Sequence, residues 1–289
     1  MAERYNYQVT GASWISEGTP AALARTVRGS LEIVSHDPLE IGAGGQLWTR
    51  KGAYEATVSL SCVGMVLADQ QLWFPTSAGV QVASFKDMLV EVDDGTSGRE
   101  WVLSEGQPAS IQIAVSEAMD GYIAQQIVAK YALVTPQAIG TDVCVYNSVN
   151  GHTINDTRVT GGAADIDCLS FELSNDLGIT PNNPMNERSA GSKTAIDGYF
   201  INPQAGPGLS FVTGGPLWGG TGDELFDDAW TDVSYAIALA NGTAGENISY
   251  ALSEFTPRQW NMGVGGDHSG FAHVLAPAAG TVYNRVVLS

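Results

Sequence analysis

The chain repeats itself: motifs of its first half recur in the same order in its second half. Ser30-Leu31-Glu32-Ile33 corresponds to Ser170-Phe171-Glu172-Leu173, and Leu103-Ser104-Glu105 corresponds to Leu252-Ser253-Glu254. The offset between matching residues changes slowly along the chain and stays between 139 and 149 residues. Three more matches fall between these two in the same order: Gly52 with Gly191, Leu72-Trp73 with Leu217-Trp218, and Asp94-Gly95 with Asn241-Gly242. Such a repeat restricts the fold to two copies of one supersecondary unit.

Each copy has the residue pattern of a β domain. Alternating apolar and polar residues predict strands at 28–35, 57–63 and 88–92 in the first copy and at 167–174, 195–201 and 233–239 in the second. The Asp-Gly and Asn-Gly pairs are hairpin signals, and a closing strand is expected at 127–134 and at 282–288. After each repeated Trp, within 73–87 and 218–232, the sequence predicts a short helix.

We therefore predict a mainly β protein made of two sequential β domains, each carrying one short helix. The domains are assigned to residues 25–134 and 151–289, with a Pro-containing linker at 135–150. Residues 1–24 have no counterpart in the repeat and are assigned to an N-terminal segment, in which Trp14 is a candidate anchor on a neighbouring subunit. Charged residues make up only 15% of the chain, which disfavours both disorder and long surface helices.

Charge and composition exclude several classes of function. The net charge of -18 excludes a basic groove that grips nucleic acid. No apolar run reaches 18 residues and residues 1–10 are polar, so we expect no membrane span, no signal peptide and synthesis in a cytoplasm. Cys62, Cys144 and Cys168 lack Cys-x-x-Cys spacing and are expected to be free, buried thiols.

The residues offer no catalytic constellation. Gly266-Asp267-His268-Ser269-Gly270 contains Ser, His and Asp, but sequence neighbours cannot form a triad by adjacency and the nucleophile-elbow spacing is missing. Asp267, His268 and His273 lack metal-ligand spacing, and the glycine-rich runs at 42–45 and 214–220 lack the other residues of a nucleotide loop. We predict no enzyme, no cofactor and no metal site.

One run of residues suggests a family. Ile166-Asp167-Cys168-Leu169-Ser170-Phe171-Glu172-Leu173-Ser174-Asn175-Asp176-Leu177 resembles a strand of the tail tube proteins of long-tailed, siphovirus-type bacteriophages. In that family the strand leads into a long stacking loop and then into a second strand that begins after a glycine, as residues 191–201 do here. Residues 28–35, 42–50 and 56–63 resemble the same unit in the first half. The resemblance covers residues 25–289 and indicates a major tail tube protein with a duplicated domain.

The resemblance implies a fold, an assembly and a function. Tail tube domains are small β-sandwiches flanked by a helix, and six of them form a ring in which four strands per domain join laterally around a lumen. Two domains per chain imply a homotrimeric, pseudo-hexameric ring. Stacked rings form the virion tail after synthesis in the host cytoplasm, with the tape measure, tail terminator and distal tail proteins as partners. DNA passes through the tube to the host without specific binding, since an anionic lumen repels its phosphates.

A long loop follows the first strand of each copy, at residues 37–51 and 180–189. These loops are too polar to fold alone and too long to be simple connectors, so we expect a neighbouring ring to order them. The candidate stacking residues are Gly42, Gly44, Gly45, Leu47, Trp48, Arg50, Lys51, Pro181, Pro184, Met185 and Arg188. Their candidate acidic partners are Asp223, Glu224, Asp227 and Asp228.

The alternative interpretation is a two-domain β-sandwich that binds carbohydrate or decorates a capsid or cell surface. It would use exposed Trp rings, so it depends on the role of Trp73 and Trp218, which occupy equivalent positions in the repeat. We favour a core role for this pair because a duplicated domain duplicates its core anchors.

Overall fold

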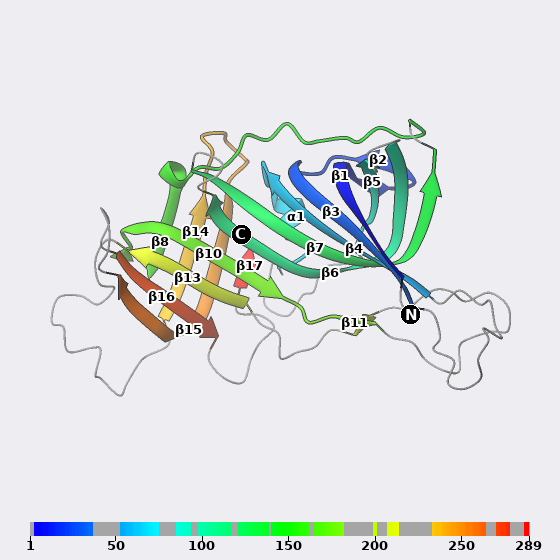
Figure 1. The fold of residues 1–289 in the computed structure, drawn as a ribbon. Coiled ribbons are helices and arrows are strands. Elements are labelled where there is room, and N and C mark those ends of the chain that lie inside the picture. The colour runs from blue at the N-terminus through cyan, green and yellow to red at the C-terminus, as the bar shows by residue number, and fades with distance from the viewer. Residues whose placement is uncertain are drawn as a thin grey trace, which may run out of the picture.

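The structure is a computed structural model. It describes residues 3–36, 53–74, 85–93, 98–116, 121–138, 140–161, 164–181, 199–200, 207–213, 233–263, 270–277 and 286–288. Within these ranges most residues lie in antiparallel β-strands (Figure 1). The exceptions among the described elements are one short helix, α1 (Leu67–Gln70), and one 3-10 turn (Ile154–Asp156). The prediction of a mainly β protein is confirmed.

The strands of the first half close on themselves. They follow the order β1-β3-β4-β7-β6-β5, and β5 also pairs with β1, so the sheet forms a closed, barrel-like ring. Alternating side chains of these strands point to the interior and form an apolar core. The strands are β1 (Glu3–Ser16), β2 (Thr19–Ala21), β3 (Arg25–His36), β4 (Ala53–Val63), β5 (Asp87–Asp93), β6 (Gly98–Ser116) and β7 (Tyr122–Gln137).

The strands of the second half repeat this order of pairing. The path β10-β13-β16-β15-β14-β8 corresponds to the path β3-β4-β7-β6-β5-β1. The two paths differ at one place, because β3 pairs with β1 whereas β10 pairs with β6 of the first half. The strands are β8 (Thr157–Gly161), β9 (Ala164–Asp165), β10 (Cys168–Asp176), β11 (Thr180–Pro181), β12 (Tyr199–Phe200), β13 (Pro207–Thr213), β14 (Val233–Leu239), β15 (Ile248–Gly263), β16 (Gly270–Pro277) and β17 (Val286–Leu288).

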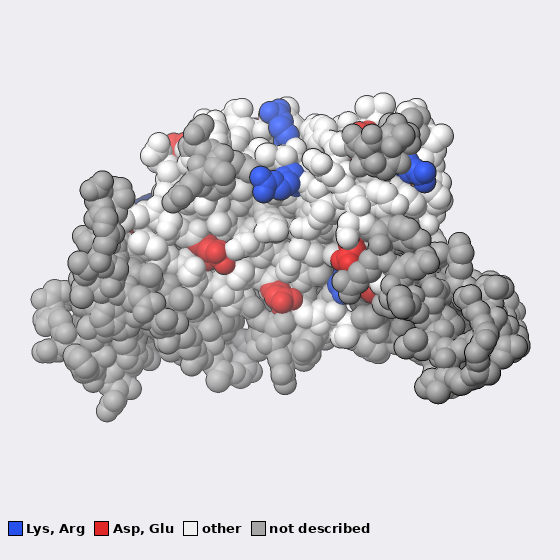
Figure 2. Space-filling model, viewed as in Figure 1, with Lys and Arg blue, Asp and Glu red and all other residues white. Residues whose placement is uncertain are grey.

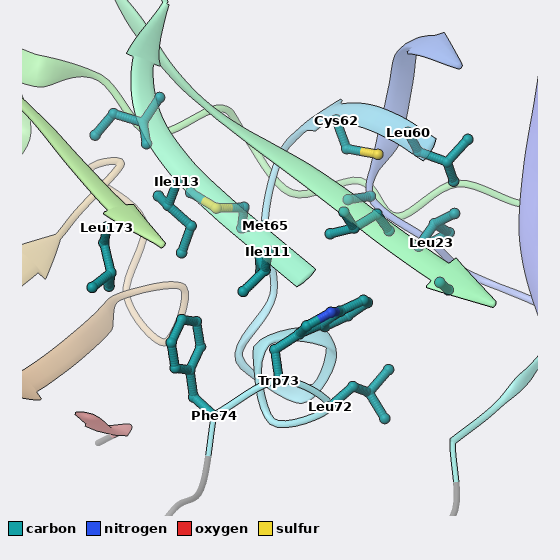
Figure 3. Packing of buried hydrophobic residues seen from close by; sticks show 14 of the residues in the cluster. Leu23, Leu60, Cys62, Met65, Leu72, Trp73, Phe74, Ile111, Ile113 and Leu173 are labelled. Carbon is teal, nitrogen blue, oxygen red and sulfur yellow. The ribbon is translucent and has the colours of Figure 1, made fainter. Parts of the chain in front are cut away.

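The hydrophobic core continues from one half into the other. Trp73 and Phe74, which follow α1, lie under β6 and near Ile111 and Leu173, as Figure 3 shows. Trp73 is 4% exposed, so the predicted core role is confirmed for this residue. Its repeat partner Trp218 lies outside the described residues.

Most of the predicted strands are confirmed. β3, β4, β5, β10 and β14 contain all or nearly all of the predicted ranges, and the closing strands correspond to β7 and β17. β5 pairs with β6, and β14 with β15, on either side of the Asp-Gly and Asn-Gly pairs, so both hairpins form. The sequence identifies these elements because each buries one face and therefore alternates.

The N-terminal segment does not stand apart from the first half. Its residues form β1, which pairs with both β3 and β5. Trp14 is fully buried, so it is not exposed for contact with a neighbouring subunit. The repeat gave no indication of this strand because the second half has only the shorter β8 at the corresponding place.

The linker is shorter than expected and is held against the first half. β7 extends to Gln137, which takes up the first three residues assigned to the linker. The Leu23 N–H donates to the Val145 carbonyl at 3.1 Å, and the Asn147 N–H donates to the Leu23 carbonyl at 2.9 Å. Figure 1 shows this segment crossing the molecule from the end of β7 toward β8.

One further expectation needs correction, and another lies mostly outside the described residues. Of the strand expected at 195–201 only β12 is described, and it pairs with β11, whereas β10 pairs with β13. β13 begins with Pro207 and Gly208. These residue types are more typical of turns than of strands, so the sequence does not predict a strand here. The helix expected within 73–87 falls mostly outside the described residues, as does all of 218–232, and α1 lies just before the first of these ranges.

Candidate functional site

Nearly all of the predicted stacking residues lie outside the described part of the chain. Pro181 is described, and it ends β11, where it pairs with Tyr199. Outside the described ranges lie Gly42, Gly44, Gly45, Leu47, Trp48, Arg50, Lys51, Pro184, Met185, Arg188 and the acidic candidates Asp223, Glu224, Asp227 and Asp228. Their stacking role stays a prediction.

The described residues point to a different feature, the junction between β6 and β10. These strands pair antiparallel over five residues, from Glu172 opposite Ala114 to Asp176 opposite Ser110. The Leu177 N–H extends this ladder by donating to the Ala109 carbonyl at 2.9 Å. Backbone pairing therefore joins the two halves into one continuous sheet.

Buried polar contacts support the junction from its core side. The Asn175 Nδ2 group donates to the Trp73 carbonyl at 2.9 Å, and both side chains are buried. The Tyr250 hydroxyl donates to Gln70 Oε1 at 2.9 Å, and the Gln70 amide donates in turn to Gln125 Oε1. Breaking either contact would leave a buried polar group without a partner, which costs more than an ordinary hydrogen bond gains. The segment from α1 to Phe74 thus links both halves.

One carboxyl group of α1 is buried at this place. Asp69 is 2% exposed and accepts a 2.8 Å hydrogen bond from the Trp14 Nε1 group. Burial raises the pKa of Asp69 to about 6, although the Trp14 hydrogen bond and the Lys86 charge act in the opposite direction. The Trp14 ring meets Phe85 edge-on at 5.6 Å between centroids, and Phe85 meets Trp73 in the same way. This cluster fixes α1 against β1.

β6 and β15 share an irregularity at equivalent positions. In the ladder between β6 and β7, the register shifts between Pro108 and Ser110. In the ladder between β15 and β16, it shifts between Pro257 and Gln259. A proline has no N–H for the ladder, so a register shift beside it is expected. Because the shift falls at the same place after the proline in both strands, each residue of β6 has a counterpart in β15, and Ser110 corresponds to Gln259.

The outer face of the continuous sheet is rich in small hydroxyl and amide side chains. These residues alternate with the buried ones on β4, β6, β7, β10 and β13, and they are Thr57, Ser59, Ser61, Ser110, Gln112, Gln126, Ser170, Ser174 and Ser210. The face also carries the ion pair between Lys130 Nζ and Glu55 Oε1 at 3.0 Å. Figure 2 shows this face with isolated charged groups among uncharged atoms. This face of the sheet therefore combines many uncharged polar side chains with a few charged ones, among them Glu172.

The described residues contain no assembled metal site or reactive thiol. No three His, Cys, Asp or Glu side chains in this part of the chain come together as metal ligands would. All three cysteines are free; burial raises the pKa of Cys62 and Cys144 to about 12 and that of Cys168 to about 11. Thiols with such pKa values are almost fully protonated at neutral pH and are poor nucleophiles. No described helix is long and apolar enough to span a membrane.

The β6–β10 junction does not follow from the sequence. Strand alternation shows which face of a strand is buried, but it does not show which strand lies beside it. The available signal was the repeated proline, Pro108 and Pro257, which follows the Leu-Ser-Glu motif by the same distance in both copies. No family model matches the sequence, and no curated protein matches it either.

Proposed function

We propose that this chain is a structural protein whose copies join side by side into rings, and that stacked rings form the tail tube of a long-tailed bacteriophage. Each ring holds three chains and six copies of the repeated unit. The observation that carries this proposal is the β6–β10 ladder, which already joins two such units within one chain.

In this proposal the two halves are tandem domains of one kind. Their shared pairing order and the matching register shifts after Pro108 and Pro257 support this assignment. Each half contributes four consecutive strands to the continuous sheet, β3-β4-β7-β6 and β10-β13-β16-β15. Four strands per domain is also the lateral unit of the family that the sequence resembles.

The outer face of the sheet is the proposed wall of the lumen. Its hydroxyl and amide groups offer DNA phosphates few charge-assisted hydrogen bonds, which are the strong ones. With a net charge of -18, the chain as a whole also repels phosphates. DNA would therefore slide along this wall and would not adsorb to it.

Native mass measurement and negative-stain microscopy of concentrated protein test this function. We expect rings of three 30.4 kDa chains, about 91 kDa in total, and tubes built from them. Rings of six chains would contradict the assignment of two domains per chain. Monomers at every concentration, together with binding to a glycan array, would instead support a carbohydrate-binding role.

A further inference from the structure

We propose that residues Glu3–Asn6 of β1 and residues Gln259–Gly263 of a second copy compete for the same edge of β3. The N-terminus must then leave this edge before two copies can join. The inference rests on the proposed lateral assembly; it identifies the two strands that meet and the segment that keeps them apart.

The β6–β10 junction serves as the template for contact between copies. β15 corresponds to β6, because both carry the register shift after an equivalent proline. β3 corresponds to β10, because Leu31 and Ile33 are buried as Phe171 and Leu173 are, and each strand pairs on one edge with the next strand of its own unit. The intermolecular counterpart of β6–β10 is therefore β15 of one chain against β3 of the next.

The β6–β10 junction also predicts which residues of β15 and β3 lie opposite each other between copies. Ser110–Ala114 of β6 correspond to Gln259–Gly263 of β15, and Glu172–Asp176 of β10 correspond to Glu32–His36 of β3. In the junction Glu172 lies opposite Ala114 and Asp176 lies opposite Ser110. Between copies, Glu32 would lie opposite Gly263, and His36 opposite Gln259.

Of the two edges that would meet between copies, the one on β15 is open in the described chain. β14 pairs with β15 between Ile248 and Phe255, and β16 pairs with the other edge of β15 as far as Gly263. Beyond Phe255, no strand of the described chain pairs with the β14 side of β15. This open stretch corresponds to the stretch of β6 that receives β10.

The other edge is covered by the chain's own N-terminus. β3 pairs with β4 on one edge, and on the opposite edge Glu3–Gln8 of β1 pair with Ser30–Ser35. Within this ladder Glu3 lies opposite Ser35 and Asn6 lies opposite Glu32. The covered residues Glu32–Ser35 are four of the five that the template assigns to the second copy. An edge has one set of backbone donors and acceptors, so both strands cannot pair with it at once.

The second half of the chain has no such cover among its described residues. Val9 pairs with Val92 of β5, and Thr157 pairs with Leu239 of β14. Val92 and Leu239 lie opposite Arg99 and Ile248, which are 149 residues apart as the two prolines are, so Val9 corresponds to Thr157. The residues before Thr157 form the 3-10 turn, and the buried His152 ring contacts the Glu246 carbonyl at 3.0 Å. These residues do not pair with β10, and the edge of β10 accepts β6 instead. The cover is thus an addition specific to the first half.

Two variants test the inference: a reversible disulfide that holds β1 on β3, called the lock below, and a deletion that removes the first residues of β1. Asn6→Cys together with Glu32→Cys places two thiols at directly opposite positions of the β1–β3 ladder, where a disulfide is feasible. Ser16→Cys with Thr19→Cys is the matched control, because it links β1 to β2 and leaves the N-terminus free. Deletion of residues 1–6 uncovers Glu32–Ser35 but keeps Tyr7, whose ring packs at 5.9 Å from that of Trp101. Assembly is followed by light scattering and sedimentation across a concentration series.

The oxidised lock should abolish ring formation, and reduction of the same sample should restore it, whereas the oxidised control pair should assemble normally. The deletion should lower the concentration needed for assembly by about tenfold or more. A lock that assembles equally well when oxidised, or a deletion without effect on that concentration, would overturn this inference and leave the proposed function in place. Wild type and deletion variant that both stay monomeric would overturn the proposed function and this inference together.

Discussion

Replacing Asp69 by Asn tests the position of α1 in the core and should stabilise the protein in a pH-dependent way. Asp69 is 2% exposed, and burial raises its pKa from 3.8 to about 6. A carboxyl group whose pKa is higher in the folded state binds its proton more tightly there. The wild-type protein should therefore lose stability as the pH rises from about 4 to 6, while the Asn variant carries no such ionisation.

The size of the effect follows from the shift in pKa. A difference of about two pKa units corresponds to about 3 kcal/mol between the fully protonated and fully ionised limits. Between pH 4 and pH 8 we expect the variant to gain about 2.5 kcal/mol relative to wild type. The side-chain oxygen of the substituted amide can still accept the hydrogen bond from Trp14, and any constant cost of the amide cancels when the two pH values are compared.

Urea unfolding followed by Trp fluorescence measures this difference at pH 4, 6 and 8, at a protein concentration low enough to avoid assembly. Asp165→Asn is the control: hydrogen bonding to Arg158 lowers the pKa of this exposed carboxyl group, so its effect should have the opposite sign. A difference between Asp69→Asn and wild type that stays constant from pH 4 to pH 8 would refute the burial of this carboxyl group and the placement of α1.

Four further predictions follow from the described residues and the repeat. Trp73→Ala should lower the free energy of unfolding by about 3–5 kcal/mol, measured by urea unfolding, and an unchanged midpoint would place the ring at the surface. Glu105 is exposed with φ 56°, so Glu105→Gly should raise that free energy by about 0.5–1 kcal/mol while Glu105→Ala gives no gain. The fully buried Cys62 should react with a thiol reagent over hours in the native protein and within minutes in denaturant, followed by peptide mass mapping, whereas Cys144 and Cys168 are only half-buried; fast native labelling of Cys62 would contradict its burial. Deleting residues 42–48 should leave a folded protein that forms rings but no tubes by electron microscopy, and tubes of normal length would disprove a stacking role for this loop.

The sequence predicts many, but not all, of the strands that bury one face and leave the other exposed. β13 and β10 alternate between buried and half-buried residues, yet only β10 was predicted, because β13 begins with Pro207 and Gly208. β1 contains the buried Val9 and Trp14, but it has no equally long counterpart in the second half. A comparison of the two halves therefore favours elements that both halves share and gives no indication of β1.

The β6–β10 junction could not be predicted from the sequence, for a different reason. A ladder such as β6–β10 depends on backbone groups, which every residue except proline carries alike. The residue pattern of Ser110–Ala114 and Glu172–Asp176 indicates which face of each strand is buried, but it does not indicate which strand lies beside it. The proline shared by β6 and β15 is visible in the sequence, and the register shift beside it supports the alignment of the two strands, but neither feature identifies β10 as the neighbour of β6.

A chain that polymerises through strand edges must also avoid pairing with other copies too early, because open edges invite uncontrolled association. In the proposed assembly each contact between copies needs one edge of β15 and one edge of β3, so covering either of them is sufficient to block it. Releasing Glu3–Asn6 from β3 leaves the pairing of Gln8–Ile15 with β5 in place, so this edge can be uncovered without opening the rest of β1. In the proposed assembly the duplication supplies the geometry of the contact through β6 and β10, and β1, whose described counterpart β8 is shorter, lies on the edge of β3 that this contact would use.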